Sequence, residues 1–179
     1  MTVAEAVRYH VLDPAGLNST GFDYSRTGIA DRLIPGNQGG VEVPFADLGW
    51  QFPAGSAYSS VSDLTALGWA LMRRAKGEGG PLETVLGVAE ARDCLGVDIW
   101  NRDGTTLMGA PWEMEVQGPF LVKRKGGNLP GYSTLFAMVP QLDLTVMIGW
   151  NAGQNEFGAV PDAVYKYLLP AMNASLTEA

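Results

Sequence analysis

Three short runs near the end of the chain carry its clearest strand pattern. Residues 120–125, 133–139 and 144–150 are rich in β-branched, aromatic and other apolar side chains and are bounded by Gly, Pro and Asp. Such runs are typical of strands joined by hairpins. The pattern predicts a three-stranded antiparallel meander, in which the first strand stops at Gly126-Gly127 and a loop over 128–131 leads to the second.

Helical spacing of apolar positions appears elsewhere in the chain. The predicted helices cover 3–11, 59–75, 81–87 and 160–172, and extended segments cover 95–100 and 107–116. The first two helices open with capping boxes, in which a hydroxyl residue precedes an acidic residue by three positions. The pattern therefore predicts one α+β domain over 1–179, an antiparallel sheet with helices on one or both of its faces.

Composition limits the possible partners. The formal charge is −7, which disfavours nucleic acid and anionic membranes as partners. No apolar run reaches the roughly 18 residues of a spanning helix, so no membrane span is expected. The sequence does not indicate a cellular compartment.

Cysteine and histidine chemistry is sparse. Cys94 and His10 are the single residues of their types, so an internal disulfide is impossible and no metal-ligand spacing exists. No metal or cofactor is expected. Ser59 and Ser60 stand where a helix starts, where a hydroxyl is typically occupied in capping the backbone.

The triplet Lys125-Gly126-Gly127 is where chemistry is expected. A lysine beside two glycines puts a cation next to backbone that a ligand can approach closely. Unpaired N–H groups at a strand end can hold a carbonyl oxygen or an oxyanion. A surface lysine before a glycine-rich turn is the alternative interpretation of the same three residues.

Three blocks of sequence extend this pattern. They read LDPAGLNSTGF at 12–22, FPAGSAYSSVSDL at 52–64, and KGGNLPGYSTLFAMVPQLDLTVMIGWN at 125–151. In this order they resemble segments of the serine β-lactamase and penicillin-binding-protein-like family, which also contains esterases. The last block is similar to the part of that family that carries a Lys-Thr-Gly or related triplet on its active-site strand.

The resemblance implies roles for individual residues. Lys125 would supply positive charge toward the carboxylate of a small-molecule acyl substrate or toward the catalytic hydroxyl network. Gly126 and Gly127 would let that substrate lie along the strand, and the N–H of Asn128 would be an oxyanion donor. Tyr24 and Trp112 would line the cleft; the alternative is that these two aromatic side chains only pack against the core.

One departure from the family pattern decides the functional prediction. No serine is followed three residues later by lysine, so the Ser-x-x-Lys nucleophile box is absent from these 179 residues. We therefore expect the C-terminal portion of a serine hydrolase, with the N-terminal part missing and no activity by itself. A non-catalytic binding or pseudoenzyme module is the main alternative, and an enzyme of another class is a third.

The missing part also affects the predicted sheet. In the resembling fold, strands from the start and the end of the domain pair side by side. The run 144–150 is apolar and carries no charge, and without its neighbour it is expected to self-associate.

Overall fold

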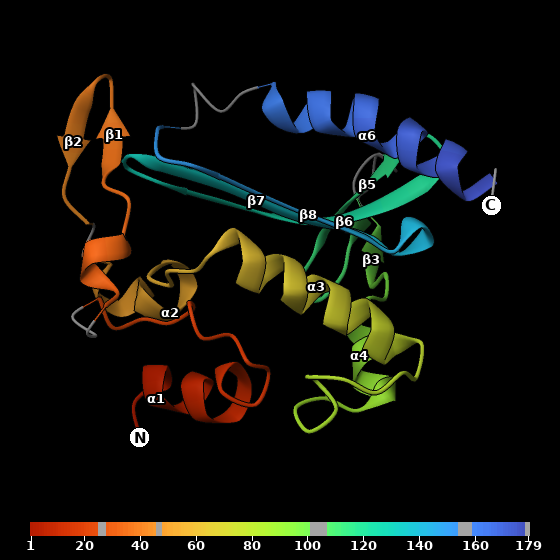
Figure 1. The fold of residues 1–179 in the computed structure, drawn as a ribbon, viewed down its shortest axis with the longest axis horizontal. Helices are drawn as coiled ribbons and strands as arrows, with labels where there is room; N and C mark the ends of the chain where they lie inside the picture. Colours follow the sequence, from red (N-terminus) through yellow and green to blue (C-terminus); the bar gives the residue numbers. More distant parts are fainter. Residues whose placement is uncertain (25–27, 46–47, 101–106, 154–158, 178–179) are drawn as a thin grey trace.

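The fold has three layers built around one antiparallel sheet. The computed structural model describes residues 1–24, 28–45, 48–100, 107–153 and 159–177. In Figure 1, helix α6 (Val160–Thr177) covers one face of the sheet, and helix α3 (Val61–Ala75) lies on the other. Helix α1 (Val3–Val7) lies beyond α3, on the side away from the sheet. The predicted α+β class is confirmed, and of the two arrangements that the sequence left open, the helices lie on both faces.

The main sheet is a sequential meander of six strands. They are β3 (Ile99–Trp100), β4 (Leu107–Met108), β5 (Glu113–Gln117), β6 (Phe120–Leu129), β7 (Tyr132–Val139) and β8 (Leu144–Trp150). Each strand pairs antiparallel with the next. The three-stranded meander expected from the sequence is its second half, and β8 forms one end of the order.

Strand β6 is longer than the sequence pattern predicts. It continues through the two glycines and Asn128 to Leu129, where β7 pairs with it in unbroken register. Pro130-Gly131 alone reverses the chain, and Gly131 has a positive φ of +77°, as the second of the two central residues of a type II turn requires. The predicted strand end at Gly126-Gly127 is thus wrong, because pairing with β7 outweighs the weak strand preference of glycine.

The helices follow their predicted positions with one exception. Besides α1, α3 and α6, the chain forms a π-helical turn at Arg8–Leu12, α2 at Phe52–Gly55, α4 at Val88–Cys94, and 3₁₀ turns at Ala30–Arg32, Gly49–Gln51 and Pro140–Leu142. The helix predicted over 81–87 is wrong, since residues 81–85 form turns and α4 begins only after Gly87. Leu82 is buried, and it holds this turn against the core.

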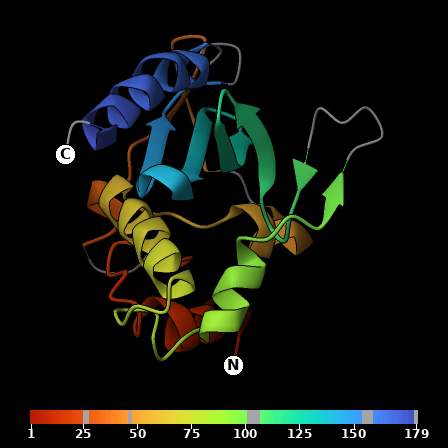
Figure 2. The same cartoon turned by 90° about the vertical axis from the view of Figure 1, so that its right-hand side faces the viewer.

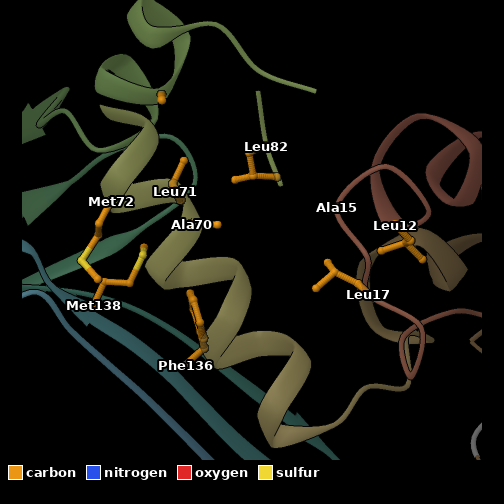
Figure 3. Packing of buried hydrophobic residues seen from close by; sticks show 10 residues of the cluster. Leu12, Ala15, Leu17, Ala70, Leu71, Met72, Leu82, Phe136 and Met138 are labelled. Atoms are coloured by element: carbon orange, nitrogen blue, oxygen red, sulfur yellow. The ribbon is translucent and has the colours of Figure 1, made fainter. Parts of the chain in front are cut away.

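Each face of the sheet has its own hydrophobic core. The core under α6 contains Tyr165 and Leu169 of that helix together with the inward side chains of β6 and β7. The core on the other face joins α3 to β7 through Met72, Phe136 and Met138 (Figure 3). A Cβ on Gly68 would lie 2.7 Å from Thr145 Cγ2, so this glycine is what lets α3 lie close to β8.

The helix-start serines have structural partners. Ser60 caps α3 by accepting from the Asp63 N–H at 3.1 Å, as predicted, and the Ser59 hydroxyl lies 2.7 Å from Thr20 Oγ1. The Asp63 carboxylate also accepts from the Thr20 hydroxyl and from the Ser19 N–H. This cluster ties the segment after α1 to the start of α3.

A small second sheet closes the end of the main one. Strands β1 (Gly36–Gln38) and β2 (Val41–Val43) form a hairpin beside the β6–β7 turn (Figure 1). Figure 2 shows the main sheet between α6 and α3. The Asn37 N–H donates to the Gly131 carbonyl at 3.2 Å, and the Tyr132 hydroxyl donates to the Ile34 carbonyl at 2.9 Å. The hairpin is therefore anchored to the same end of β6 and β7 to which the candidate site extends.

Candidate functional site

The candidate site is an edge of β6 that its neighbour leaves uncovered. Strand β5 pairs only with the first half of β6, and its last partner is Arg124, opposite Glu113. Within the described residues, the second half, Lys125–Leu129, pairs with a strand on one side only, where β7 lies. An edge of this kind can receive an extended ligand through backbone hydrogen bonds.

Lys125 stands where this open edge begins. Its Nζ donates to Glu113 Oε1 at 3.1 Å and to the Gly126 carbonyl at 3.0 Å, and its side chain is half exposed. The ion pair fixes the ammonium at the end of β5. The sequence does not indicate Glu113 as a partner of Lys125, because their pairing arises only from the β5–β6 register.

The two glycines serve the edge in different ways. Both are exposed, and at Gly126 an added Cβ would meet only the Thr134 carbonyl oxygen, at 3.9 Å. At Gly127 an added Cβ would lie 2.5 Å from Thr134 Oγ1, so a side chain there would displace the Thr134 hydroxyl. Asn128 follows, exposed and paired in register with Ser133. The four residues form one continuous exposed strand segment.

Tyr24 lies at the far end of this segment, within a stack of rings. Its hydroxyl donates to the Ser56 carbonyl at 2.7 Å, and its ring is parallel to that of Phe45, with centroids 5.3 Å apart. Phe45 is stacked in turn on Tyr132, at 6.0 Å. We call Tyr24, Phe45 and Tyr132 the aromatic shelf. Burial raises the pKa of Tyr24 and of Tyr132 above the ordinary value of 10.0.

Trp112 lies at the other end of the segment, in core packing. Its ring is 5.4 Å from Phe136, which is the register partner of Lys125. Its indole N–H is buried without a hydrogen-bond acceptor of ordinary geometry. Burial raises the pKa of the neighbouring Cys94 thiol. The interaction of this thiol with the Trp112 indole lowers the pKa, but by less than burial raises it. Trp112 is thus close to Lys125, but it is partly covered, and its role as a substrate contact stays a prediction.

Lys123 is the unexpected residue of this strand. It is 5% exposed, although it carries an amine, and it lies in register between the buried Met114 and Met138. The partner of Nζ is the thioether sulfur of Met114 at 3.5 Å, which is a weak acceptor. Burial lowers the pKa of Lys123 below its ordinary value of 10.5. The alternation of side chains along β6 places Lys123 on the same face as Lys125, but it does not predict that Lys123 is buried.

Replacing this amine should stabilise the chain. We expect Lys123→Met to raise the free energy of unfolding at pH 7 by about 1–3 kcal/mol, because a poorly solvated polar group is removed from a methionine-lined site. Since folding lowers the pKa of Lys123, the folded state binds fewer protons than the unfolded state, and wild-type stability rises with pH up to about 10.5. The advantage of the variant should therefore shrink over that alkaline range.

Urea unfolding of the two proteins at several pH values measures this difference. Lys166→Met on α6 is the matched control, because Lys166 is exposed beside Tyr167 and should give nearly no change. Destabilisation by Lys123→Met would contradict the assignment of an unfavourable buried amine.

The described part of the chain holds no cluster of three or more His, Cys, Asp or Glu side chains arranged as metal ligands would be. Its helices are all too short or too polar to cross a bilayer.

Comparison with solved structures decides the fold family. The chain superposes on a class C β-lactamase from Rhodobacter sphaeroides with a TM-score of 0.69 and 18% identity, covering 86% of this chain and 50% of that one. It also superposes on the D-amino acid amidase from Ochrobactrum anthropi SV3, with a TM-score of 0.64 and 16% identity over 92% of this chain and 53% of the enzyme. The chain has the serine β-lactamase fold. The resemblance drawn from the three sequence blocks is confirmed.

Sequence relatives agree with this assignment. The human protein beta-lactamase-like 1 is 37% identical over 97% of this chain, and beta-lactamase-like protein 2 of Dictyostelium discoideum is 26% identical over the same share. The chain spans only about a third of each relative, 34% and 31% of their lengths. No protein-family model matches the chain.

Proposed function

We propose that this β-lactamase-like chain forms the substrate-binding half of an acyl-serine hydrolase or transferase. The observation that carries the proposal is the open edge of β6, with the Lys125 cation at its start and two glycines after it. An ester or amide substrate would lie along Lys125–Asn128, and the Asn128 N–H would be one oxyanion donor. The nucleophilic serine and its lysine would come from a Ser-x-x-Lys segment outside these 179 residues.

The chain covers only part of each relative, which supports a substrate-binding portion in this chain and a nucleophile supplied by another segment. The chain matches a third of the curated relatives and about half of the solved enzymes, and it contains no Ser-x-x-Lys. Penicillin-binding, transpeptidase, esterase and amidase activities all remain within the proposed reaction class, since each begins with serine attack on an acyl carbonyl.

A non-catalytic binding module of the same fold is the second candidate. The observation that favours it is the ion pair between Lys125 and Glu113, which engages the cation with a neighbouring strand. A pseudoenzyme would keep the edge for binding and would not need a nucleophile.

The test uses the purified chain and a version extended by the in-frame codons upstream of Met1. We expect the 179-residue chain to show no burst with nitrocefin or p-nitrophenyl acetate and no labelling by a fluorophosphonate. We expect the extended version to be labelled at the serine of its Ser-x-x-Lys segment.

Each outcome separates the candidates. Stoichiometric labelling of one serine in the 179-residue chain would overturn the proposal in favour of another enzyme class. An extended version that lacks the box, or that carries it and remains unlabelled, would favour the binding module.

A further inference from the structure

The aromatic shelf is a surface that the fold holds rigid and leaves partly open. Phe45 is 47% exposed, although it is a large apolar side chain stacked with two tyrosine rings. Both tyrosine hydroxyls of the shelf are engaged with backbone carbonyls, of Ser56 and Ile34. The two hydroxyl groups are therefore already hydrogen-bonded, and the solvent-exposed surface of the shelf includes apolar ring atoms of Phe45.

Close backbone packing fixes the shelf in place. An added Cβ on Gly36 would lie 2.5 Å from Tyr132 Cε2, so the ring of Tyr132 lies directly against the β1 backbone. The ring of Tyr24 also contacts Tyr58, with centroids 5.8 Å apart. Three separate segments of the chain thus meet to form one stack, and little conformational freedom would be lost when a ligand binds to it.

The shelf is continuous with the open edge of β6. Tyr132 is the register partner of Leu129, the last residue of that edge. Leu129 Cδ2 in turn lies 4.0 Å from the position that a Cβ on Gly55 would occupy. The residue that follows Gly55 is Ser56, whose carbonyl accepts a hydrogen bond from the Tyr24 hydroxyl. Leu129 is four residues further along the strand than Lys125, which is about 13 Å at roughly 3.3 Å per residue. A ligand extended along the edge therefore has a cation at one end and aromatic rings at the other.

We propose that the aromatic shelf is the specificity-determining surface of this site and selects acyl compounds that carry an aromatic or bulky apolar side group. The inference rests on the proposed function, because it takes the β6 edge as the place where the acyl backbone lies. Rings gain from offset or edge-to-face contact beyond the burial of their area, and Phe45 has ring surface exposed for such a contact. A compound with a methyl side group would meet the edge but not the shelf.

The test compares two neutral probes that differ only in the side group. N-acetyl-phenylalanine methylamide and N-acetyl-alanine methylamide are titrated into the ¹⁵N-labelled 179-residue chain at a protein concentration below that at which it self-associates, and amide shifts are followed. We expect both probes to shift Gly126–Asn128, and only the phenylalanine probe to shift Phe45 and Tyr132. We expect that probe to bind roughly tenfold more tightly, as one added aromatic contact allows.

Variants of the shelf test the cause of this preference. Phe45→Ala should remove most of the tenfold preference while leaving the alanine probe unchanged, and Phe45→Leu should retain part of it. Trp69→Ala is the control, because Trp69 is 45% exposed on α3 and already lies beside Arg73. It should leave both probes unaffected.

The outcomes distinguish the shelf from the proposed function. Equal binding of both probes at Gly126–Asn128, or a preference that survives Phe45→Ala, would overturn the shelf and leave the proposed function standing. Shifts at Phe45 and Tyr132 without any at the β6 edge would support an aromatic-binding shelf and count against the proposed function. If neither probe saturates the chain, both the role of the shelf and the proposed function are wrong.

Discussion

The purified 179-residue chain is expected to self-associate through strand β8. This strand ends the main sheet, and within the described residues it pairs with a strand on one side only. Its seven residues, Leu144–Trp150, include no charged side chain and no proline. Charges and prolines are what natural edge strands typically use to prevent strand addition, so this edge is expected to recruit a second copy.

A charge placed on this edge should restore the monomer. At Gly149 an added Cβ would meet no atom within 4 Å, so Gly149→Lys introduces an edge lysine without a clash. Gly153→Lys is the matched control, since it makes the same change of charge beyond the end of the strand, also in open space. Light scattering over a range of concentrations should show a mass that grows for wild type and Gly153→Lys and stays monomeric for Gly149→Lys.

Hydrogen exchange can contradict the prediction that β8 is an open edge. A stable wild-type monomer at high concentration, with protection of those amides in Thr145–Ile148 that point away from β7, would mean that the edge is covered by the chain itself. An amino-terminal fragment supplied in trans that pairs with β8 should, conversely, suppress the association of the wild type.

In an extended version that carries the Ser-x-x-Lys segment, Lys125→Ala should slow acylation by roughly 100- to 1000-fold. Removing one preorganised electrostatic stabiliser typically raises a barrier by about 2.7–4 kcal/mol, which corresponds to a loss of that size. The fold should survive, because the Lys125 side chain is half exposed and an exposed ion pair such as that with Glu113 contributes little to stability. Stopped-flow acylation and the melting temperature measure the two effects separately.

A second lysine provides the control for this variant. Lys166→Ala removes the same charge from the exposed surface of α6 and should leave acylation unchanged. If Lys125→Ala acylates at the wild-type rate with an unchanged melting temperature, Lys125 is an ordinary surface lysine and the role proposed for it is wrong.

Local pattern was sufficient for the elements whose neighbours along the chain determine them. The capping box of Thr2 and Glu5 is present with both of its hydrogen bonds, and Ser60 caps α3 as expected. The strands 133–139 and 144–150 appear within one residue of their predicted limits. In these stretches side-chain period and capping chemistry agree, and each acts over only a few residues.

The errors occur where a distant partner decides the structure. Gly126 and Gly127 are poor strand formers alone, and they are strand residues because β7 pairs with them. The segment over 81–87 has helical composition, but the burial of Leu82 holds it as turns. Neither pairing nor burial across the fold can be read from a local window of sequence.

The sequence by itself determined the fold class, the family resemblance and the candidate triplet, because these depend on residue types in a fixed order along the chain. Only the tertiary structure decided that Lys125 meets Glu113, that Lys123 is buried between methionines, and that Tyr24 stacks with Phe45 and Tyr132. Each of these contacts joins residues from different elements. It therefore follows from strand register and the packing of layers, which pattern along one segment does not specify.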